Sequence, residues 1–260
     1  MPLLFDHVLR AQRRDRAARS GPALFLHERA FADLLERLPL FDRRFGRALI
    51  IGCPDPAWRE RLKIVADEVA AVDPGPLFAA ALDEDAVREE QLGIAPGSVD
   101  LIVAIGTLDT IDDLPGTLRR LALALRAGGL LIGAMSGGDT LPRLRAAMLA
   151  AGKQAGAAQA HVHPRIEAAA LAPLLEQAGL VRPVVDVDRV RIAYGSFGRL
   201  VADLRAMAAT NVLRVRPRTG LTRSFRADAE SAFAAAGSAG KTLETIEVLH
   251  FMAWQQAPAA

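Results

Sequence analysis

Apolar residues follow two different spacings along the chain, and the spacing changes after residue 46. Before that point Phe31, Leu34 and Leu38 recur at intervals of three and four residues, which places their side chains on one face of a helix. Pro22 stands ahead of this run, and proline there is typical of a helix start. We therefore expect residues 1–46 to form two N-terminal helices.

After residue 46, short apolar runs alternate with helical patterns. The runs that predict strands are RALIIG (47–52), EVAAVDP (68–74), a shorter LFAAALDE (77–84), SVDLIVAIGT (98–107), GLLIGAMS (129–136), VRPVVDVDRVRIAY (181–194) and TIEVLHFMAW (245–254). The last of these is expected to be short and to close the sheet. Strands that alternate with helices and are apolar on both faces are typical of a parallel sheet covered on both sides.

The expected fold class is therefore α/β, with residues 1–260 as one domain. Within it we place a core sheet over 47–194, a helical cap over 195–245 and a last strand over 246–256. The length and the hydrophobic content of 51% fit one large globular domain.

Membrane and disulfide classes are disfavoured by the composition. No apolar run reaches the roughly 18 uncharged residues that a membrane helix needs, so we expect no integral membrane segment. The single cysteine, Cys53, excludes an internal disulfide and a cysteine-based metal cluster. It suits a reducing compartment, and we expect a cytoplasmic protein.

The charges are nearly balanced, with 32 Lys and Arg against 30 Asp and Glu, and almost all of the cations are arginine. The densest run, RAQRRDRAAR over residues 10–19, has a basic face for an acidic partner, although a solvated helix face explains it more simply. A basic stripe with interleaved aromatic residues is missing from the sequence, which disfavours nucleic-acid binding. The oligomeric state stays open.

Candidate site residues directly follow the predicted strands, because ligands bind beyond the carboxyl ends of the strands in an open α/β sheet. Gly52 follows the first strand and Asp73 the second, where an acid can accept hydrogen bonds from two ribose hydroxyls. Asp83 and Glu84 follow the next predicted strand and are placed to accept from an exocyclic amine. An ordinary Asp-Pro-Gly turn also explains Asp73.

The usual phosphate-binding loops, GxGxxG and GxxxxGKS, do not occur in the sequence. Their absence, together with the acids after two strands, favours an adenosine ligand without a pyrophosphate. This points to S-adenosylmethionine more than to NAD or ATP.

Several longer segments are distinctive: LLIGAMSGGDTLPRLRAAM (130–148), AHVHPRIEAAALAPLLEQAGL (160–180), VDVDRVRIAYGSFGRLVADLRAMAATN (185–211) and the N-terminal LFDHVLRAQRRDRAAR (4–19). They resemble the methyltransferase-like proteins related to mitochondrial complex I assembly factor five, and the resemblance covers nearly the whole chain. More distantly, the layout is similar to the methyltransferase that esterifies a malonyl-carrier protein in biotin synthesis.

The resemblance implies a class I S-adenosylmethionine fold, a Rossmann-like seven-stranded sheet whose last strand is antiparallel. The cofactor-binding candidates at the strand ends are Gly52, Cys53, Asp73, Pro74, Asp83, Glu84, Ile105 and Gly106.

The catalytic candidates are His161 and Asp139. His161 aligns with a family histidine and suits a base near neutral pH, because histidine titrates there. Asp139 follows the strand GLLIGAMS, where a substrate could lie, or it caps the following helix. His161 and His163 also form a His-x-His pair, which can bind metal. No carboxylate pattern accompanies the pair, so we expect no metal.

The loop after the first strand departs from the family's acid-x-Gly-x-Gly-x-Gly pattern. It reads IIGCPDP, with Ile50 at the position of the acid and with Pro54 and Pro56 at two glycine positions. Proline fixes φ near −65° and has no N–H, so the loop loses donors, although a cofactor without phosphate needs fewer of them. Asp55 contacts the cofactor's ammonium or, more simply, caps the next helix.

The leading hypothesis is an S-adenosylmethionine-dependent methyltransferase that acts on a protein partner or a carrier-bound substrate. One alternative is a non-enzymatic assembly factor for a respiratory complex that kept the fold and lost the cofactor. The other is a hydroxylase-type modifier of a complex I subunit.

Overall fold

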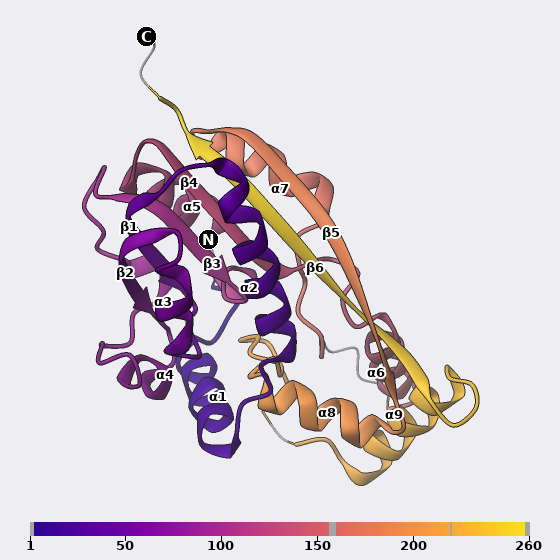
Figure 1. Cartoon of the computed structure of the whole chain (residues 1–260). Coiled ribbons are helices and arrows are strands. Elements are labelled where there is room, and N and C mark those ends of the chain that lie inside the picture. Colours follow the sequence, from indigo (N-terminus) through magenta and orange to yellow (C-terminus); the bar gives the residue numbers. More distant parts are fainter. Residues whose placement is uncertain (1–2, 156–159, 219, 258–260) are drawn as a thin grey trace.

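The computed structural model describes residues 3–155, 160–218 and 220–257. Their strands form one six-stranded sheet in the order β2-β1-β3-β4-β6-β5 (Figure 1). The strands are β1 (Phe45–Ile51), β2 (Ala66–Val72), β3 (Val99–Ile105), β4 (Leu125–Ser136), β5 (Leu180–Tyr194) and β6 (Thr242–Gln255). Strands β1 to β4 pair in parallel, and β6 runs antiparallel to both of its neighbours. The α/β class and the antiparallel last strand are thereby confirmed.

Seven strands were expected, but the described residues form six. The segment 77–84, predicted as a short strand, falls in helix α4 (Pro76–Ala80) and the turn after it. Pro76 occupies the first helical turn, where its fixed φ suits a helix. Phe78, Ala79 and Leu82 are buried, and their spacing of one, three and four residues is that of a helix face.

The last strand differs from the prediction in length and in place. Strand β6 has 14 residues and lies inside the sheet between β4 and β5, whereas a short closing strand was expected. The predicted run 245–254 lacks the first residues of the strand, where the buried Glu244 interrupts the apolar pattern.

The remaining elements are helices and short 3-10 turns: α1 (His7–Ser20), α2 (Phe25–Arg37), η1 (Leu38–Phe41), α3 (Ala57–Leu62), η2 (Glu89–Gln91), η3 (Leu108–Thr110), α5 (Leu114–Ala124), α6 (Pro142–Gln154), α7 (Ala168–Gln177), α8 (Phe197–Ala206) and α9 (Arg223–Ala235). No helix among the described residues is long and apolar enough to cross a membrane.

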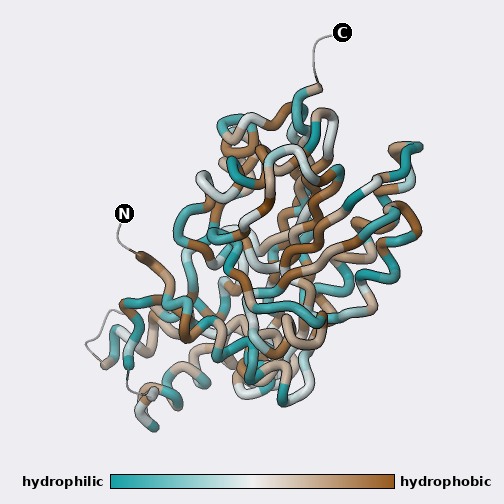
Figure 2. The backbone as a smooth tube through the Cα atoms, turned by 90° about the vertical axis from the view of Figure 1, so that its left-hand side faces the viewer, coloured by the Kyte–Doolittle hydropathy of each residue, from teal (hydrophilic) through white to brown (hydrophobic). Residues whose placement is uncertain are grey.

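Two hydrophobic clusters lie on opposite faces of the sheet. Ala48 and Ile50 of β1 belong to the cluster that α2, α3, α6, α8 and α9 cover, and Leu49 and Ile51 belong to the cluster under α5 and α7. Alternate residues of a strand face opposite sides, so the continuous apolar run of β1 is buried on both. The tube in Figure 2 is accordingly brown along the inner strands and teal along many outer turns. The predicted cover on both faces is confirmed.

Helix α1 lies at the end of the sheet where the parallel strands finish, and it packs against α4 and α8 (Figure 1). It begins after Asp6, whose side chain accepts a hydrogen bond from the backbone N–H of Leu9 at 3.0 Å. Such a cap satisfies a donor that the first helical turn leaves free. The placement of α1 decides what can reach the strand ends.

Candidate functional site

Two glycines at the strand ends have positive φ and admit no side chain. At Gly52, after β1, φ is +78°, and an added Cβ would lie 2.4 Å from the carbonyl oxygen of Ile105. At Gly106, after β3, φ is +65°, and an added Cβ would lie 2.7 Å from the ring of His27. The close approach of these loops explains why glycine stands at both positions.

Asp73, the predicted ribose acid, directly follows β2 and has no exposed surface. Its Oδ1 accepts hydrogen bonds from Arg14 Nε at 2.8 Å and from the backbone N–H of Gly75 at 2.7 Å, and Arg14 Nη2 donates to its Oδ2. The guanidinium of Arg14 also lies over the ring of Phe78, 5.2 Å from its centre. Helix α1 thus places an arginine fork on both oxygens of the acid.

A second arginine of α1 makes a parallel pair one turn earlier. Arg10 donates to both carboxylate oxygens of Glu89 at 2.8 Å and to the carbonyl oxygen of Thr107 at 2.9 Å, and Glu89 is only 1% exposed. Burial alone would raise the pKa of Glu89, but the charge and hydrogen bonds of Arg10 outweigh it and hold the pKa below its usual value.

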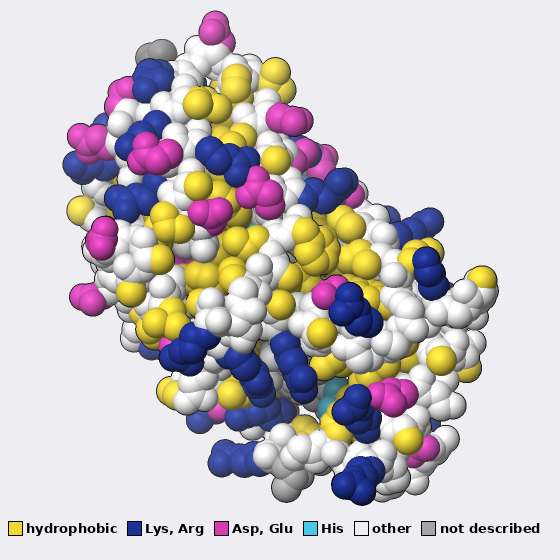
Figure 3. Space-filling model, turned by 60° about the horizontal axis from the view of Figure 1, so that its bottom comes forward, with side chains coloured by type: hydrophobic (Ala, Val, Ile, Leu, Met, Phe, Trp, Pro, Cys, Tyr) yellow, Lys and Arg dark blue, Asp and Glu magenta, His cyan; other side chains and the backbone are white. Residues whose placement is uncertain are grey.

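The arginine-rich run at the N-terminus is therefore only partly a solvated face. Arg10 and Arg14 are buried, while Arg19 of the same helix is exposed. The signal that the sequence offered is their spacing of four residues, which puts both side chains on one helix face. On the surface, arginine and lysine side chains gather in the lower part of the view in Figure 3.

Cys53 lies beside Asp73 at the first loop and is completely buried. Burial, with a smaller contribution from the charge of Asp73, raises the pKa of the Cys53 thiol to about 12. The thiol is therefore protonated at neutral pH and is not a nucleophile.

A cavity of about 100 Å³ opens beyond β3 and β4. Residues from several distant segments line it, among them Ile105, Gly106, Ser136, His27, His163 and Arg165. A pocket for a drug-sized ligand has on the order of 300 Å³ or more, so this cavity holds only a small group.

The predicted residues fall into separate places. Gly52, Cys53, Asp73 and Pro74 are buried at the ends of β1 and β2, and Ile105 and Gly106 line the cavity.

The two acids predicted beside the adenine, Asp83 and Glu84, are exposed on the turn after α4. The segment before them is a helix rather than a strand, so they do not stand at a strand end.

The two catalytic candidates are not among the residues that line this cavity. His161 lines a second hollow instead. Asp139 is exposed, with its carboxylate 4.0 Å from Arg189 Nε. Nor does Asp139 cap α6, because the carboxylate of Glu244 accepts the first backbone N–H groups of that helix. Asp55 lies one residue before the N-cap of α3, which is Pro56, and its Oδ1 accepts from the backbone N–H of Ala57 at 2.9 Å.

His163, two residues after the predicted base, is the buried histidine of the cavity. It is 4% exposed, and its Nε2 accepts a hydrogen bond from the backbone N–H of Val212 at 2.9 Å. Burial, followed by the charges of Arg165 and Arg10, lowers the pKa of His163 to about 3. The ring is therefore neutral at physiological pH, with its proton on Nδ1.

This neutral ring predicts a pH dependence of stability. Between its unfolded pKa of 6.5 and its folded pKa of about 3, the unfolded chain binds a proton that the folded chain does not. The free energy of unfolding should therefore fall with decreasing pH, with a contribution of up to about 1.4 kcal/mol per pH unit below the unfolded value.

Urea unfolding of the natural chain and of His163→Gln between about pH 7 and pH 5 isolates this contribution. Glutamine keeps an acceptor for Val212 but does not titrate, so the variant should lose less stability per pH unit. Equal slopes in the two proteins would show that His163 is protonated in the folded chain.

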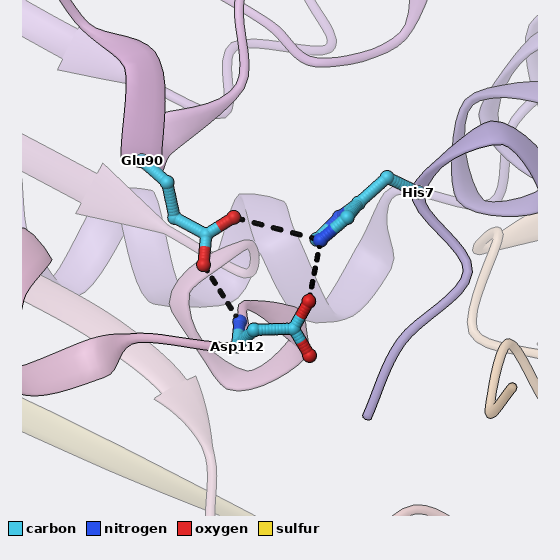
Figure 4. A group of neighbouring side chains, drawn as sticks. All are labelled: His7, Glu90 and Asp112. Atoms are coloured by element: carbon cyan, nitrogen blue, oxygen red, sulfur yellow. Dashed lines mark hydrogen bonds and ion pairs between the residues drawn. The ribbon is translucent and has the colours of Figure 1, made fainter. Parts of the chain in front are cut away.

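A cluster of His7, Glu90 and Asp112 lies where the N-terminus meets the sheet (Figure 4). His7 Nε2 is 2.7 Å from Asp112 Oδ2 and 3.5 Å from Glu90 Oε2. Asp112 Oδ1 accepts from the backbone N–H groups of Leu4 and Phe5. Burial would raise the pKa of Asp112, but the hydrogen bonds from Phe5 and His7 hold it below its usual value.

Glu90 completes this anchor from the other side. Its Oε1 accepts from the backbone N–H groups of Asp112 and Asp113, at 2.9 Å each. The carboxylates are thus engaged by the backbone, and the cluster fastens the start of α1 to the loop after β3.

As arranged, these strand ends do not fit an adenosine-type cofactor. Ribose hydroxyls need an accessible carboxylate, but Asp73 is covered and already paired with Arg14. The arginine would have to leave before a ribose could take its place.

Residues 24–182 match the family model described as a methyltransferase domain. Helix α1, with Arg10 and Arg14, precedes the matched residues.

Among curated proteins, the chain is similar to "Arginine-hydroxylase NDUFAF5, mitochondrial" of Mus musculus, with 28% identity over 80% of this chain and 64% of that protein. The human protein of the same name is 29% identical over the same shares. "Malonyl-[acyl-carrier protein] O-methyltransferase" of Laribacter hongkongensis is 32% identical over 70% of this chain and 59% of that protein. The chain thus spans less than two thirds of the length of these relatives.

Solved structures show the same fold at low identity. The YcgJ protein of Bacillus subtilis matches with a TM-score of 0.58 at 10% identity, over 88% of this chain and 99% of that one. The N-methyltransferase NodS of Bradyrhizobium japonicum, solved with S-adenosyl-L-homocysteine, matches with a TM-score of 0.50 at 17% identity, over 96% and 99%.

Proposed function

The chain belongs to the methyltransferase domain family, and we propose that it is an S-adenosylmethionine-dependent methyltransferase whose cofactor site opens when Arg14 leaves Asp73. S-adenosylmethionine is the cofactor of this family, as the sequence predicted. The observation that carries the proposal is the position of Asp73, directly after β2 and beside the loop of Gly52. That is where an α/β sheet of this kind presents an acid to a ribose.

The closed state is part of the proposal. Both oxygens of Asp73 are held by Arg14, so binding of the cofactor competes with an internal ion pair. A ligand that needs a minor conformation binds more weakly by the fraction of molecules in that conformation. The natural chain should therefore bind S-adenosylmethionine weakly.

We further propose a protein or carrier-bound substrate. Two observations support this choice: one relative is named as an O-methyltransferase of an acyl-carrier protein and another as an arginine hydroxylase. A cytoplasmic location is also a proposal, supported by the single free cysteine, whereas the vertebrate relatives are named as mitochondrial.

A second candidate is the non-enzymatic assembly factor. It is favoured by the same Arg14–Asp73 pair, which would then replace the cofactor permanently, and by Ile50 and Pro54 in the first loop. A hydroxylase-type modifier rests on the printed name of the NDUFAF5 relatives alone.

Isothermal titration calorimetry with S-adenosylmethionine and S-adenosylhomocysteine tests the proposal. We expect both ligands to bind the natural chain, with Kd values weaker than about 10 μM, because opening of the pair reduces the apparent affinity. Adenosine alone is the matched control for the methionine end. Failure of both ligands to bind, in the natural chain and in Arg14→Ala, would exclude the methyltransferase and leave the assembly factor.

A further inference from the structure

A second hollow, of about 650 Å³, lies between α1, α6, α8 and α9. We call it the arginine groove, because six arginines line it: Arg13, Arg165, Arg205, Arg216, Arg218 and Arg226. Among its described lining residues there is no aspartate or glutamate. Figure 3 shows this end of the molecule, with arginine or lysine side chains around a recess in which a histidine is visible.

Only part of this positive charge is neutralised within the protein. Arg216 pairs with Asp6 at 3.0 Å, and Arg226 makes an exposed pair with Glu230 at 2.8 Å. The other three rim arginines have no carboxylate within ion-pair distance in the part of the chain that the structure describes: Arg13, Arg205 and Arg218. A concave surface of one charge attracts ligands of the opposite charge.

Arg165 lies at the inner end of the groove, and its side chain is only 4% exposed. Its closest carboxylate, Asp109, is 3.7 Å from Nε, which is too long for a hydrogen bond, and Nε has no described hydrogen-bond partner. Nη1 donates to the carbonyl oxygen of His163 at 3.4 Å. Burying a charged group without a well-placed partner costs free energy. This indicates that a ligand supplies the missing partner of Arg165.

The groove adjoins the cavity beyond β3 and β4. Arg165, His163, Leu141 and Leu204 line both of them. A ligand in the groove would therefore lie next to the cavity at the strand ends.

Beside the arginines, part of the groove wall is apolar. Leu144 and Met148 come from α6, and Phe197, Val201 and Leu204 come from α8. An inorganic anion would leave these side chains without contacts, whereas an alkyl or acyl chain would cover them.

We propose that the arginine groove binds an anionic amphiphile, a carboxylate or phosphate ester carried on an apolar chain. Its charged group pairs with Arg165 and the rim arginines, and its chain lies along α6 and α8. This deepens the proposed function, on which it rests for the role of the ligand as substrate.

The test uses calorimetry of the full chain with decanoate and decyl phosphate, which separate the carboxylate from the phosphate. Decanamide is the uncharged match. We expect decanoate or decyl phosphate to bind at least about ten-fold more tightly than decanamide, since one good charge pair in a recess is worth a factor of this size. Flotation with phosphatidylglycerol vesicles distinguishes a lipid surface from the free amphiphile.

Two exposed rim arginines provide the variant, Arg205→Glu with Arg218→Glu. Its matched control is Arg119→Glu with Arg191→Glu, which makes the same change in charge at exposed positions outside the groove. The groove variant should lose at least about ten-fold in affinity for the anion, and the control should keep it within about two-fold. Arg165→Gln should weaken binding as well, with folding checked by circular dichroism.

Two outcomes overturn the inference: decanamide binding as tightly as both anions, or equal losses in the groove variant and its control. Titration of S-adenosylmethionine into the same samples separates this inference from the proposed function. If the cofactor binds and the amphiphile does not, the proposed groove ligand is contradicted and the proposed methyltransferase is supported. If the amphiphile binds and the cofactor does not, in the natural chain and in Arg14→Ala, the anion site is supported and the proposed methyltransferase is contradicted.

Discussion

The Arg14→Ala variant should bind S-adenosylmethionine at least about ten-fold more tightly than the natural chain, because the natural affinity is reduced by the fraction of open molecules. In the natural chain Arg14 holds both oxygens of the buried Asp73. With alanine at position 14, this carboxylate is buried without its cation. The two hydroxyls of a ribose can then donate hydrogen bonds to it and replace part of the hydrogen bonding that Arg14 supplied. The gain should appear in the Kd measured by calorimetry.

Two further variants show whether the gain comes from Asp73. Arg14→Ala with Asp73→Ala should bind the cofactor no better than the natural chain, because the acceptor for the ribose is gone. Arg19→Ala, an exposed arginine of the same helix, should leave the Kd unchanged. An Arg14→Ala protein that folds but binds no more tightly than the natural chain would show that the ion pair does not control the site.

The Arg10→Ala variant should lose about 3–5 kcal/mol of unfolding free energy, the usual cost of removing one partner from a buried ion pair. Glu89 is 1% exposed, and Arg10 donates to both of its oxygens. Without Arg10, burial would raise the pKa of Glu89, and a buried charge would remain uncompensated at neutral pH. Urea unfolding with an unchanged m value measures the loss.

The pH dependence of this loss has a defined sign. In the natural chain the pKa of Glu89 is lowered from 4.5, so its stabilising contribution is present above that value and is lost as the pH falls through the lower, folded value. In Arg10→Ala the carboxyl takes up a proton more easily, and the gap between the two proteins should narrow toward acid pH.

Arg19→Ala is the matched control, because Arg19 is exposed and lies 3.8 Å from the carboxylate of Asp15. Its loss should stay below about 1 kcal/mol. Equal losses in the two variants would show that the Arg10–Glu89 pair is worth no more than a surface pair.

Much of the sheet could be predicted because its central strands are long apolar runs. SVDLIVAIGT became β3 with small shifts at its ends, and GLLIGAMS became the later part of β4, which begins four residues before it, at Leu125. The predicted third strand, 77–84, was wrong because a short apolar run fits a strand or a buried helix equally well. The predicted strand 245–254 lacked the first three residues of β6, 242–244, and both Glu244 and Glu247 are buried in the strand.

Both of these acids have partners that a local pattern does not show. Glu244 accepts the first N–H groups of α6, and Glu247 pairs with Arg189 at 2.9 Å. Their burial depends on elements that lie far away in the sequence.

The strand-end part of the site could be predicted, since the carboxyl ends of parallel strands always meet at one edge. Gly52, Asp73 and Gly106 follow from this rule. Arg14 does not, because it reaches Asp73 across 59 positions of the chain. Arg14 covers Asp73 only because α1 packs at the strand ends. The periodicity of α1 alone does not predict where that helix packs.

The internal position of β6 has a consequence for how the chain acquires its structure during synthesis. Among the described residues, β5 pairs with β6 alone, and β6 is made from the residues Thr242–Gln255. On the ribosome, β5 therefore keeps an open hydrogen-bonding edge until residues 242–255 have emerged. Such an unpaired edge invites association with other chains, so the nascent protein is vulnerable to aggregation in the interval between the synthesis of β5 and that of β6.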